Sequence, residues 1–220
     1  MLTYPGALIF DLNGTMINDM EFHIRAWTEI LNNDLKAGLK PEQVKSQMYG
    51  KNSELLIRVF GEGRFTNEEM EHWSLEKEKR YQKAYLPHLS LIKGLREFLD
   101  KALEKKIPMA IGSAAIPFNI DFILDNLDLR KYFSAIVSAN DVRISKPHPE
   151  TFLKAADLIK AKPSNCLVFE DAPKGVEAAS AAGMKCVVLT TMHNRNEFPL
   201  NDHIVAFIQD YTDPFLLGLF

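Results

Sequence analysis

The sequence predicts an α/β fold: a doubly wound parallel sheet with an inserted α-helical domain. Six short apolar runs recur along the chain, and helical patterns separate most of them, which is typical of β-α-β units. Strands buried on both faces of a parallel sheet are expected to read as unbroken apolar runs, as these do. Between about residues 18 and 87 only helical patterns occur, which indicates a second, smaller domain.

The six expected strands share a short length and an apolar composition: Ala7–Asp11, Pro108–Gly112, Ala135–Ser138, Cys166–Phe169, Lys185–Leu189 and His203–Ile208. Helical patterns accompany them at residues 91–104, 117–127, 148–160 and 173–182. Strands alternating with helices of this length predict that the sheet is parallel.

The inserted region predicts four helices, near residues 19–34, 41–48, 53–61 and 66–85. Pro41 and Asn67 have the character of helix starts. We therefore expect a core domain of residues 1–17 and 88–220, and a helical cap domain of residues 18–87. Ligands of open α/β sheets bind beyond the carboxyl ends of the strands, so a helical insert emerging there could cover a site.

Composition excludes several classes of protein. The chain has 220 residues and a formal net charge of −3, which argues against a nucleic-acid or membrane-surface partner. No apolar run reaches the ~18 residues of a membrane span, and residues 1–10 do not resemble a signal peptide. Cys166 and Cys186 lie in apolar runs, which predicts two buried thiols rather than a disulfide framework or a zinc site. We expect a cytoplasmic, monomeric protein.

Polar side chains follow the expected central strands. Asp11 ends the first strand, and Ser113 and Ala114 follow the second. Lys146 lies in the loop before the fourth strand, and Glu170-Asp171 comes directly after that strand. Because parallel strands end at one edge of a sheet, we expect these groups to gather there.

The charges of these groups indicate phosphoryl chemistry. A buried carboxylate such as Asp11 is costly unless it is paired, and a divalent cation with a phosphoryl group would pair it. Carboxylate oxygens suit Mg²⁺, which usually takes substrate phosphate into its coordination shell. Lys146 can hold a phosphoryl oxygen, and Ser113 with the amides around Ala114 can bind others. A carboxylate at Asp11 could then attack phosphorus and form an aspartyl-phosphate.

These motifs resemble the haloacid dehalogenase superfamily of phosphotransferases over nearly the whole chain. Residues 10–15, Phe-Asp-Leu-Asn-Gly-Thr, match the first signature, and Ser113 and Lys146 match the second and third. Glu170-Asp171 matches the fourth. The resemblance implies a Rossmann-like core of this family's type and four catalytic residues: Asp11 as nucleophile, Asn13, Ser113 and Lys146. It also implies a Mg²⁺ site formed by Asp11, the Asn13 backbone carbonyl, Asp171 and Glu170.

Within the superfamily the chain is similar to the helical-cap subgroup that contains β-phosphoglucomutase and related phosphatases. That resemblance implies substrate-binding roles for seven residues: Gly14, Thr15, His23, Gly50, Lys51, Lys77 and Ala114. Tyr81 also matches a cap position facing the site. Where the mutase has an arginine that grips a distal phosphate, this chain has Ser53, with Lys51 or Arg58 as substitutes.

Asn13 departs from the family pattern, which has an aspartate acid/base there. An amide cannot exchange a proton, and loss of a general acid/base typically costs ~10²–10⁴-fold in rate. Three explanations are open: an engineered substitution, a natural enzyme for substrates with good leaving groups, or a binding relative without turnover. Asn13-Gly14 is also a dipeptide prone to deamidation, which would create an aspartate.

The sequence therefore predicts Mg²⁺-dependent phosphoryl transfer, with hydrolysis of a small phosphorylated metabolite such as a sugar phosphate as the leading activity. Isomerisation of β-glucose 1-phosphate is the alternative enzyme activity. A non-catalytic protein that binds a phosphorylated metabolite is the alternative from another class.

Overall fold

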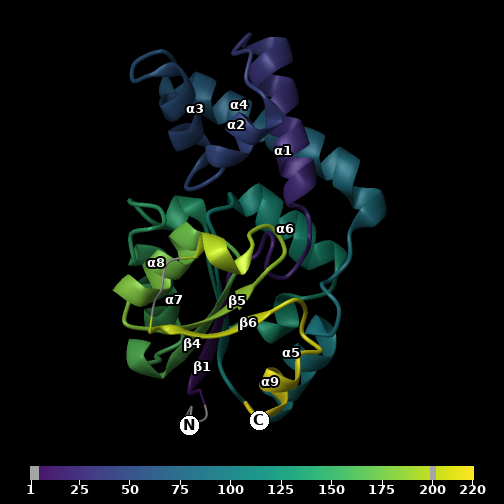
Figure 1. Ribbon diagram of the computed structural model, residues 1–220, viewed down its shortest axis with the longest axis vertical. Helices are drawn as coiled ribbons and strands as arrows, with labels where there is room; N and C mark the ends of the chain where they lie inside the picture. The colour runs from purple at the N-terminus through teal and green to yellow at the C-terminus, as the bar shows by residue number, and fades with distance from the viewer. Residues whose placement is uncertain (1–4, 199–201) are drawn as a thin grey trace. The chain divides into compact units, whose positions relative to one another are not determined.

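The computed structural model describes residues 5–198 and 202–220 and divides the chain into two compact units. One unit comprises the chain up to Asn18 and from Ser90 onward, and it holds the sheet. The other unit, Asp19–Leu89, is helical (Figure 1).

The sheet unit has six parallel strands in the order β3-β2-β1-β4-β5-β6. Their bounds are β1 Ala7–Phe10, β2 Met109–Gly112, β3 Ala135–Val137, β4 Cys166–Glu170, β5 Lys185–Leu189 and β6 Ile204–Ile208. The predicted doubly wound parallel sheet is confirmed. The chain changes direction of winding between β1 and β4, which is the position where sheets of this order bind ligands.

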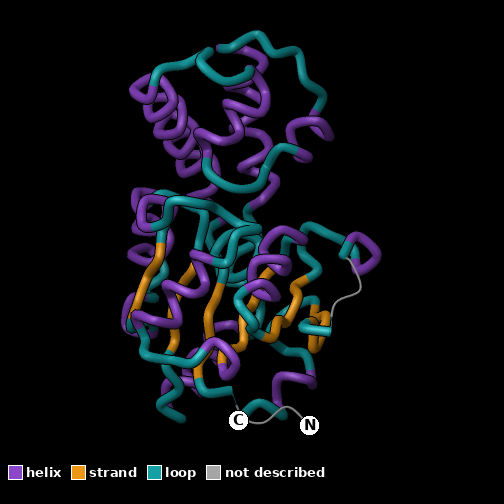
Figure 2. The backbone as a smooth tube through the Cα atoms, turned by 90° about the vertical axis from the view of Figure 1, so that its left-hand side faces the viewer, coloured by secondary structure: helices purple, strands orange, loops and turns teal. Residues whose placement is uncertain are grey.

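Helices flank the strands of this unit (Figure 2). They are α5 Leu95–Glu104, α6 Pro117–Asn126, α7 Glu150–Leu158, α8 Pro173–Ala181 and the short α9 Pro214–Leu217. The helix expected from residue 91 begins later because Gly94 has a left-handed backbone, with φ of 80°, directly before the first turn. The sequence analysis did not predict α9, which has four residues and starts where the Asp213 side chain accepts from the Phe215 amide.

Successive side chains of a strand pack on opposite faces of the sheet. On one face, Ile9 of β1 belongs to a buried cluster with Phe152 of α7 and Val176 of α8. On the other, the Phe10 ring stacks on Phe169 of β4 with ring centroids 4.8 Å apart. Both faces of β1 and β4 are therefore packed, which holds their ends in place.

The helical unit comprises α1 Met20–Glu29, a π-helical continuation Ile30–Asp34, α2 Pro41–Ser46, α3 Asn52–Phe60 and α4 Asn67–Tyr85. Helix α4 starts at a capping box in which the Thr66 hydroxyl accepts from the Glu69 amide. Its apolar core consists of six buried side chains: Trp27, Ile30, Leu31, Val44, Leu55 and Leu56. This unit therefore has a hydrophobic core of its own.

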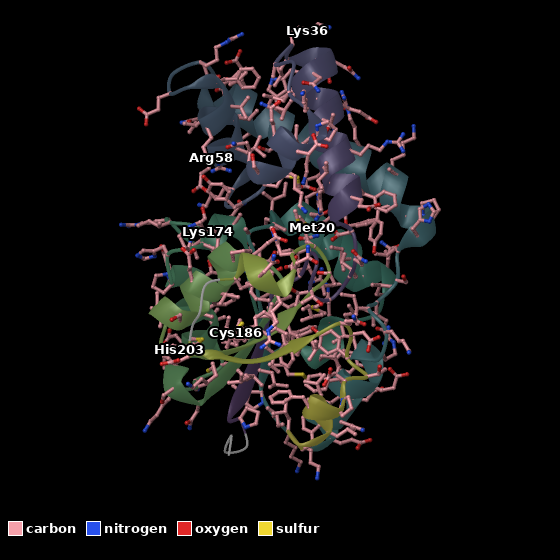
Figure 3. The ribbon with its side chains drawn as sticks, viewed as in Figure 1. Met20, Lys36, Arg58, Lys174, Cys186 and His203 are labelled. Atoms are coloured by element: carbon pink, nitrogen blue, oxygen red, sulfur yellow. The ribbon has the colours of Figure 1, made fainter. Side chains whose placement is uncertain are left out.

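Both cysteines are buried free thiols, as the sequence predicts. Cys186 lies within β5 (Figure 3), and burial raises the pKa of its thiol well above the usual value. Among the helices of the described residues, none combines the length and apolarity needed to cross a bilayer.

Candidate active site

Asp11 lies directly after β1, at the carboxyl-terminal edge of the sheet. Its amide donates to the Phe169 carbonyl at 2.9 Å, which continues the pairing of β1 with β4. Its carboxyl group is therefore fixed beside the end of β4, and the residue is only 8% exposed.

Lys146 is shared by two carboxylates. Its ammonium nitrogen lies 2.6 Å from Asp11 Oδ1 and 2.8 Å from Glu170 Oε1. The same nitrogen lies 4.5 Å from the centre of the Phe152 ring. The loop that carries Lys146 thus brings one cation to the ends of both β1 and β4.

Glu170 has hydrogen-bond donors on both of its oxygens. While Oε1 faces Lys146, Oε2 accepts from the backbone amides of Asp171 and Ala172, each at 2.8 Å. Gly175 allows this arrangement, because a Cβ atom there would overlap the Glu170 carboxyl group. Glu170 therefore orients Lys146 and the chain at Asp171.

Asp171 keeps one oxygen without a partner. Its Oδ1 accepts from the Thr15 hydroxyl at 3.2 Å, whereas buried Oδ2 has no hydrogen-bond partner among the described residues. Gly14, with φ of 78°, approaches so closely that a Cβ atom would overlap this carboxyl group. Glycine is required here for both its backbone angle and its size.

The electrostatics of this edge favour a cation. Burial, reinforced by Glu170 and only partly opposed by Lys146, raises the pKa of Asp11 to about 7. Burial and the charges of Glu170 and Asp11 raise the pKa of Asp171 well above its usual range. Three carboxyl groups face one ammonium group, so a divalent cation would relieve their repulsion.

No group of three or more His, Cys, Asp or Glu side chains within residues 5–198 and 202–220 is arranged to hold a metal ion. The donor set nevertheless fits a hard cation of the magnesium type. Asp11 and Asp171 supply carboxylate oxygens, Asp171 Oδ2 is buried without a partner, and backbone carbonyls of the loop can supply further oxygens.

Asn13 and Gly14 form the tight loop after Asp11. The Gly14 amide donates to the Ile17 carbonyl at 2.9 Å. Deamidation of Asn13 would use this same nitrogen as its nucleophile, so the hydrogen bond opposes the reaction in the folded protein.

Ser113 follows β2, the neighbour of β1, and is 2% exposed. Its hydroxyl oxygen accepts from the Ala115 amide at 3.1 Å, so the turn through Ala114 is closed over the serine. The strand order thus places Ser113 and Ala114 at the same sheet edge as Asp11.

Two residues of this edge were missed by the sequence analysis. The Thr191 hydroxyl donates to the Gly14 carbonyl at 2.6 Å, and the Tyr211 hydroxyl donates to the Thr15 carbonyl at 3.1 Å. Thr191 comes shortly after β5, so the rule that found the other strand-end residues could have found it. Tyr211 comes three residues after β6, so the same rule applies to it.

The remaining candidates lie in the helical unit. His23 of α1 and Lys77 of α4 are buried, with His23 Nδ1 and Lys77 Nζ 2.6 Å apart. Gly50, with φ of 71°, and Lys51 lead into α3, and the Lys51 amide donates to Glu54 at 2.9 Å. The candidates thus fall into two groups, one in each unit.

A family model described as haloacid dehalogenase-like hydrolase matches residues 8–189. The chain is 32% identical to fructose-1-phosphate phosphatase YqaB of Escherichia coli, over 84% of this chain and 95% of the relative. It is 31% identical to β-phosphoglucomutase of Bacillus subtilis, over 82% and 81% respectively.

A solved structure of a family IA hydrolase of the same type from Entamoeba histolytica has a similar fold. It superposes with a TM-score of 0.83 at 23% identity, covering 97% of this chain and 98% of that one. The resemblance stated from the sequence motifs is therefore confirmed.

Proposed function

We propose, from the premise that this chain belongs to the haloacid dehalogenase-like hydrolase family, that it hydrolyses a small phosphorylated metabolite through an aspartyl-phosphate at Asp11. The observation that carries the proposal is the arrangement of Asp11, Lys146 and Glu170, with Asp171 beside them. Lys146 holds the Asp11 carboxylate at a fixed position, and the Asp171 carboxylate has an oxygen free for a cation.

Mg²⁺ is the cation that this donor set suits. The Asp11 and Asp171 side chains and the Asn13 carbonyl would hold it, since both Glu170 oxygens already have donors. When bound, the ion would offset the carboxylate charge and polarise the phosphoryl group.

The protein groups perform the transfer in two steps. An oxygen of Asp11 attacks phosphorus, the bond between phosphorus and the ester oxygen breaks, and the ester oxygen takes a proton from solvent while the phosphoryl group stays on Asp11. Lys146, Ser113 and the amides near Ala114 would bind the phosphoryl oxygens in both steps. Water then attacks phosphorus, the bond between phosphorus and the Asp11 oxygen breaks, and the proton of the water goes to the released phosphate or to solvent, which restores the Asp11 carboxylate.

Asn13 limits both steps. Its amide can donate a hydrogen bond to the leaving oxygen or orient the water, but it cannot transfer a proton. We therefore expect slow turnover of esters with poor leaving groups. The same residue favours a second candidate function, a protein that binds phosphorylated metabolites without turning them over.

The named relatives support a sugar phosphate as substrate, because one acts on fructose 1-phosphate and the other is a phosphoglucomutase. Isomerisation of β-glucose 1-phosphate remains the alternative enzyme reaction. The proposed substrate-binding residues of the sheet unit are Gly14, Thr15 and Ala114, and those of the cap are His23, Gly50, Lys51 and Lys77. The proposal is for a monomeric cytoplasmic enzyme without a nucleic-acid or membrane partner.

The test is phosphate release from a panel of sugar phosphates, acyl phosphates and pyrophosphate, with Mg²⁺ or with a chelator. The proposal expects release that needs Mg²⁺ and is abolished in Asp11→Asn, while Asp121→Asn, on the exposed side of α6, leaves it unchanged. Binding of these compounds without release from any of them would favour the non-catalytic function. A mutase would require a bisphosphate activator and yield an isomer.

A further inference from the structure

A hollow lies between α1 and α4 on the surface of the helical unit. Its volume is about 480 Å³, within the ~300–1,000 Å³ range of small-molecule sites. The longer side chains that line it are Phe22, Arg25 and Glu29 of α1, Arg80 and Lys83 of α4, and His88 of the 3₁₀ turn Leu86–His88. All of its lining residues lie within Asp19–Leu89, and none of them is a residue of the candidate active site. The hollow is therefore a feature of the helical unit alone.

The hollow follows from the spacing of residues on two helices that pack together. The lining residues of α1 and those of α4 recur at intervals of three and four positions, so each set lies on one face of its helix. The two helices lie side by side (Figure 1), and the Phe22 ring packs on Tyr85 with ring centroids 4.9 Å apart. The remaining lining residues, Ala26 and Ala84, are short and leave space between the longer side chains.

One end of the hollow is aromatic. Phe22 is the first lining residue of α1, and His88 follows the end of α4. The centroids of their two rings lie 5.4 Å apart. An aromatic group packed against such rings gains stability beyond the apolar area that it buries. This end of the hollow therefore suits an aromatic group.

Two cations of the hollow keep free hydrogen-bond donors. Arg25 Nε donates to Glu29 Oε1 at 3.1 Å, whereas the two Nη groups of Arg25 have no partner among the described residues. Lys83 has no hydrogen-bond or ion-pair partner within residues 5–198 and 202–220. Free donors thus line the hollow from both helices.

The balance of charge favours a ligand with one negative charge. Arg80 has little charge to spare, because its guanidinium group lies 2.7 Å from Asp34 and 3.1 Å from Glu76. The other lining charges are the two cations with free donors and Glu29, which leave one net positive charge when the histidine is neutral. A monoanion matches this charge, whereas a phosphate dianion exceeds it. Arginine and lysine both form strong hydrogen bonds to a carboxylate.

We propose that this hollow binds an aromatic monocarboxylate. The ring of the ligand lies against Phe22 and His88. Its carboxylate accepts hydrogen bonds from Arg25 and Lys83, which joins α1 to α4. The existing pair of this arginine with Glu29 is exposed and contributes little, so the arginine can turn to the ligand at small cost. This binding needs neither Mg²⁺ nor turnover at the sheet edge, so it is independent of the proposed function.

The test is an NMR titration of the backbone amide resonances of the whole chain, without Mg²⁺, with three probes. The first probe, 3-phenylpropanoate, has both the ring and the carboxylate, whereas 3-phenylpropan-1-ol lacks the charge and hexanoate lacks the ring. We expect 3-phenylpropanoate to shift resonances of α1 and α4 with a Kd on the order of 1 mM, as for a ligand of its size. The alcohol should bind at least about tenfold more weakly, because charge-assisted hydrogen bonds are lost. Hexanoate should bind about two- to tenfold more weakly, because the aromatic contact is lost.

Lys83→Met removes one proposed donor. Lys83 is exposed and has no partner among the described residues, so the variant should fold as the natural chain does. It should weaken binding of 3-phenylpropanoate about tenfold and change binding of the alcohol by less than about twofold. Lys79→Met is the matched control, because Lys79 is an exposed lysine one turn earlier on α4 that does not line the hollow. The control should leave the Kd of 3-phenylpropanoate within about twofold of its value in the natural chain.

Several results would overturn the inference. One is the absence of saturable shifts in α1 and α4 at about ten times the expected Kd. Another is equal binding of the acid and the alcohol, which means that the cations take no part. Equal weakening in Lys83→Met and Lys79→Met would indicate a general effect of charge rather than a site. Shifts at the ends of β1 and β4 alone, lost in Asp11→Asn, would place the probe at the sheet edge instead. None of these results bears on phosphate release, which tests the proposed function separately.

Discussion

At the sheet edge one lysine is shared by two carboxylates, whereas in the helical unit one lysine is shared by a carboxylate and a histidine. Lys146 contacts Asp11 and Glu170, and Lys77 contacts Glu78 and His23. Each region also contains one buried carboxylate oxygen without a partner among the described residues, on Asp171 and on Glu78.

The two carboxylates differ in the charge that surrounds them. Asp171 lies beside Asp11 and Glu170, and the pKa values of Asp11 and Asp171 are both raised, so the free oxygen of Asp171 suits a cation. Lys77, His23 and Asn52 outweigh the effect of burial on Glu78 and lower its pKa, so this carboxylate stays charged near neutral pH with the help of its neighbours in the helical unit. Similar buried lysine–carboxylate pairs thus leave an excess of carboxyl groups in one region and a stabilised single carboxylate in the other.

The largest expected effect concerns the proton transfer that Asn13 lacks. Asn13→Asp should raise kcat for a sugar phosphate by ~10²–10⁴-fold, because it restores a general acid/base at the sheet edge. Steady-state phosphate release measures this increase in kcat. An acyl phosphate is the control, because its good leaving group needs little protonation and its kcat should therefore rise less. An unchanged kcat for both substrates would show that position 13 does not exchange protons in this protein.

Removal of Lys146 tests the charge balance of the sheet edge. Lys146→Met leaves Asp11 and Glu170 buried without their cation, and breaking such a pair costs about 3–5 kcal/mol of stability at neutral pH. Urea unfolding measures the loss, and Mg²⁺ should recover part of it.

The control is Lys174→Met, because Lys174 forms an exposed pair with Glu177 (Lys174 is labelled in Figure 3). Exposed ion pairs contribute only about 0–1 kcal/mol to the free energy of unfolding. Similar losses in the two variants would mean that Lys146 does not balance buried charge.

Gly14→Ala tests the close approach to Asp171. We expect a loss of roughly 1–3 kcal/mol in unfolding free energy, because the added Cβ overlaps Asp171 and the backbone angle is left-handed. Gly183→Ala is the matched control: its φ is 72°, but a Cβ there meets nothing within 4 Å. The difference in unfolding free energy between the two variants measures the cost of the overlap with Asp171. Equal losses of unfolding free energy would show that the overlap costs nothing.

The smallest expected effect is the pH dependence of stability due to Glu78. Its lowered pKa in the folded state contributes stability that is present above the unfolded value of about 4.3 and is lost as pH falls through the folded value. Glu78→Gln should therefore destabilise the protein at pH 7, and the difference from the unaltered protein should shrink on acidification. A constant difference between pH 7 and pH 3.5 in urea unfolding would contradict the lowered pKa.

The two regions also differ in how far the sequence predicts them. Apolar runs and the parallel arrangement were enough to bring Asp11, Lys146, Glu170 and Asp171 to one edge, because strand ends follow from chain order. They could not show that Glu170 is fully occupied by Lys146 and two backbone amides. That depends on the turn after β4, which only three-dimensional structure fixes.

In the helical unit the sequence indicated His23 and Lys77 only through family resemblance. The contact of Glu78 with Asn52 was not predicted because it joins positions 26 residues apart on two helices, and helical periodicity does not set the relative rotation of helices. The π-helical stretch Ile30–Asp34 likewise has no signature in the apolar pattern, which predicted one helix to residue 34.

The central claim, that Asp11 receives the phosphoryl group, is tested most directly by chemical trapping. The protein is mixed with Mg²⁺ and a turned-over substrate, quenched with acid and reduced with borohydride, and the peptide containing residue 11 is analysed by mass spectrometry. The account predicts homoserine at position 11, formed by reduction of an aspartyl-phosphate. Continued phosphate release in Asp11→Asn, with no modified residue 11 in the parent chain, would contradict it.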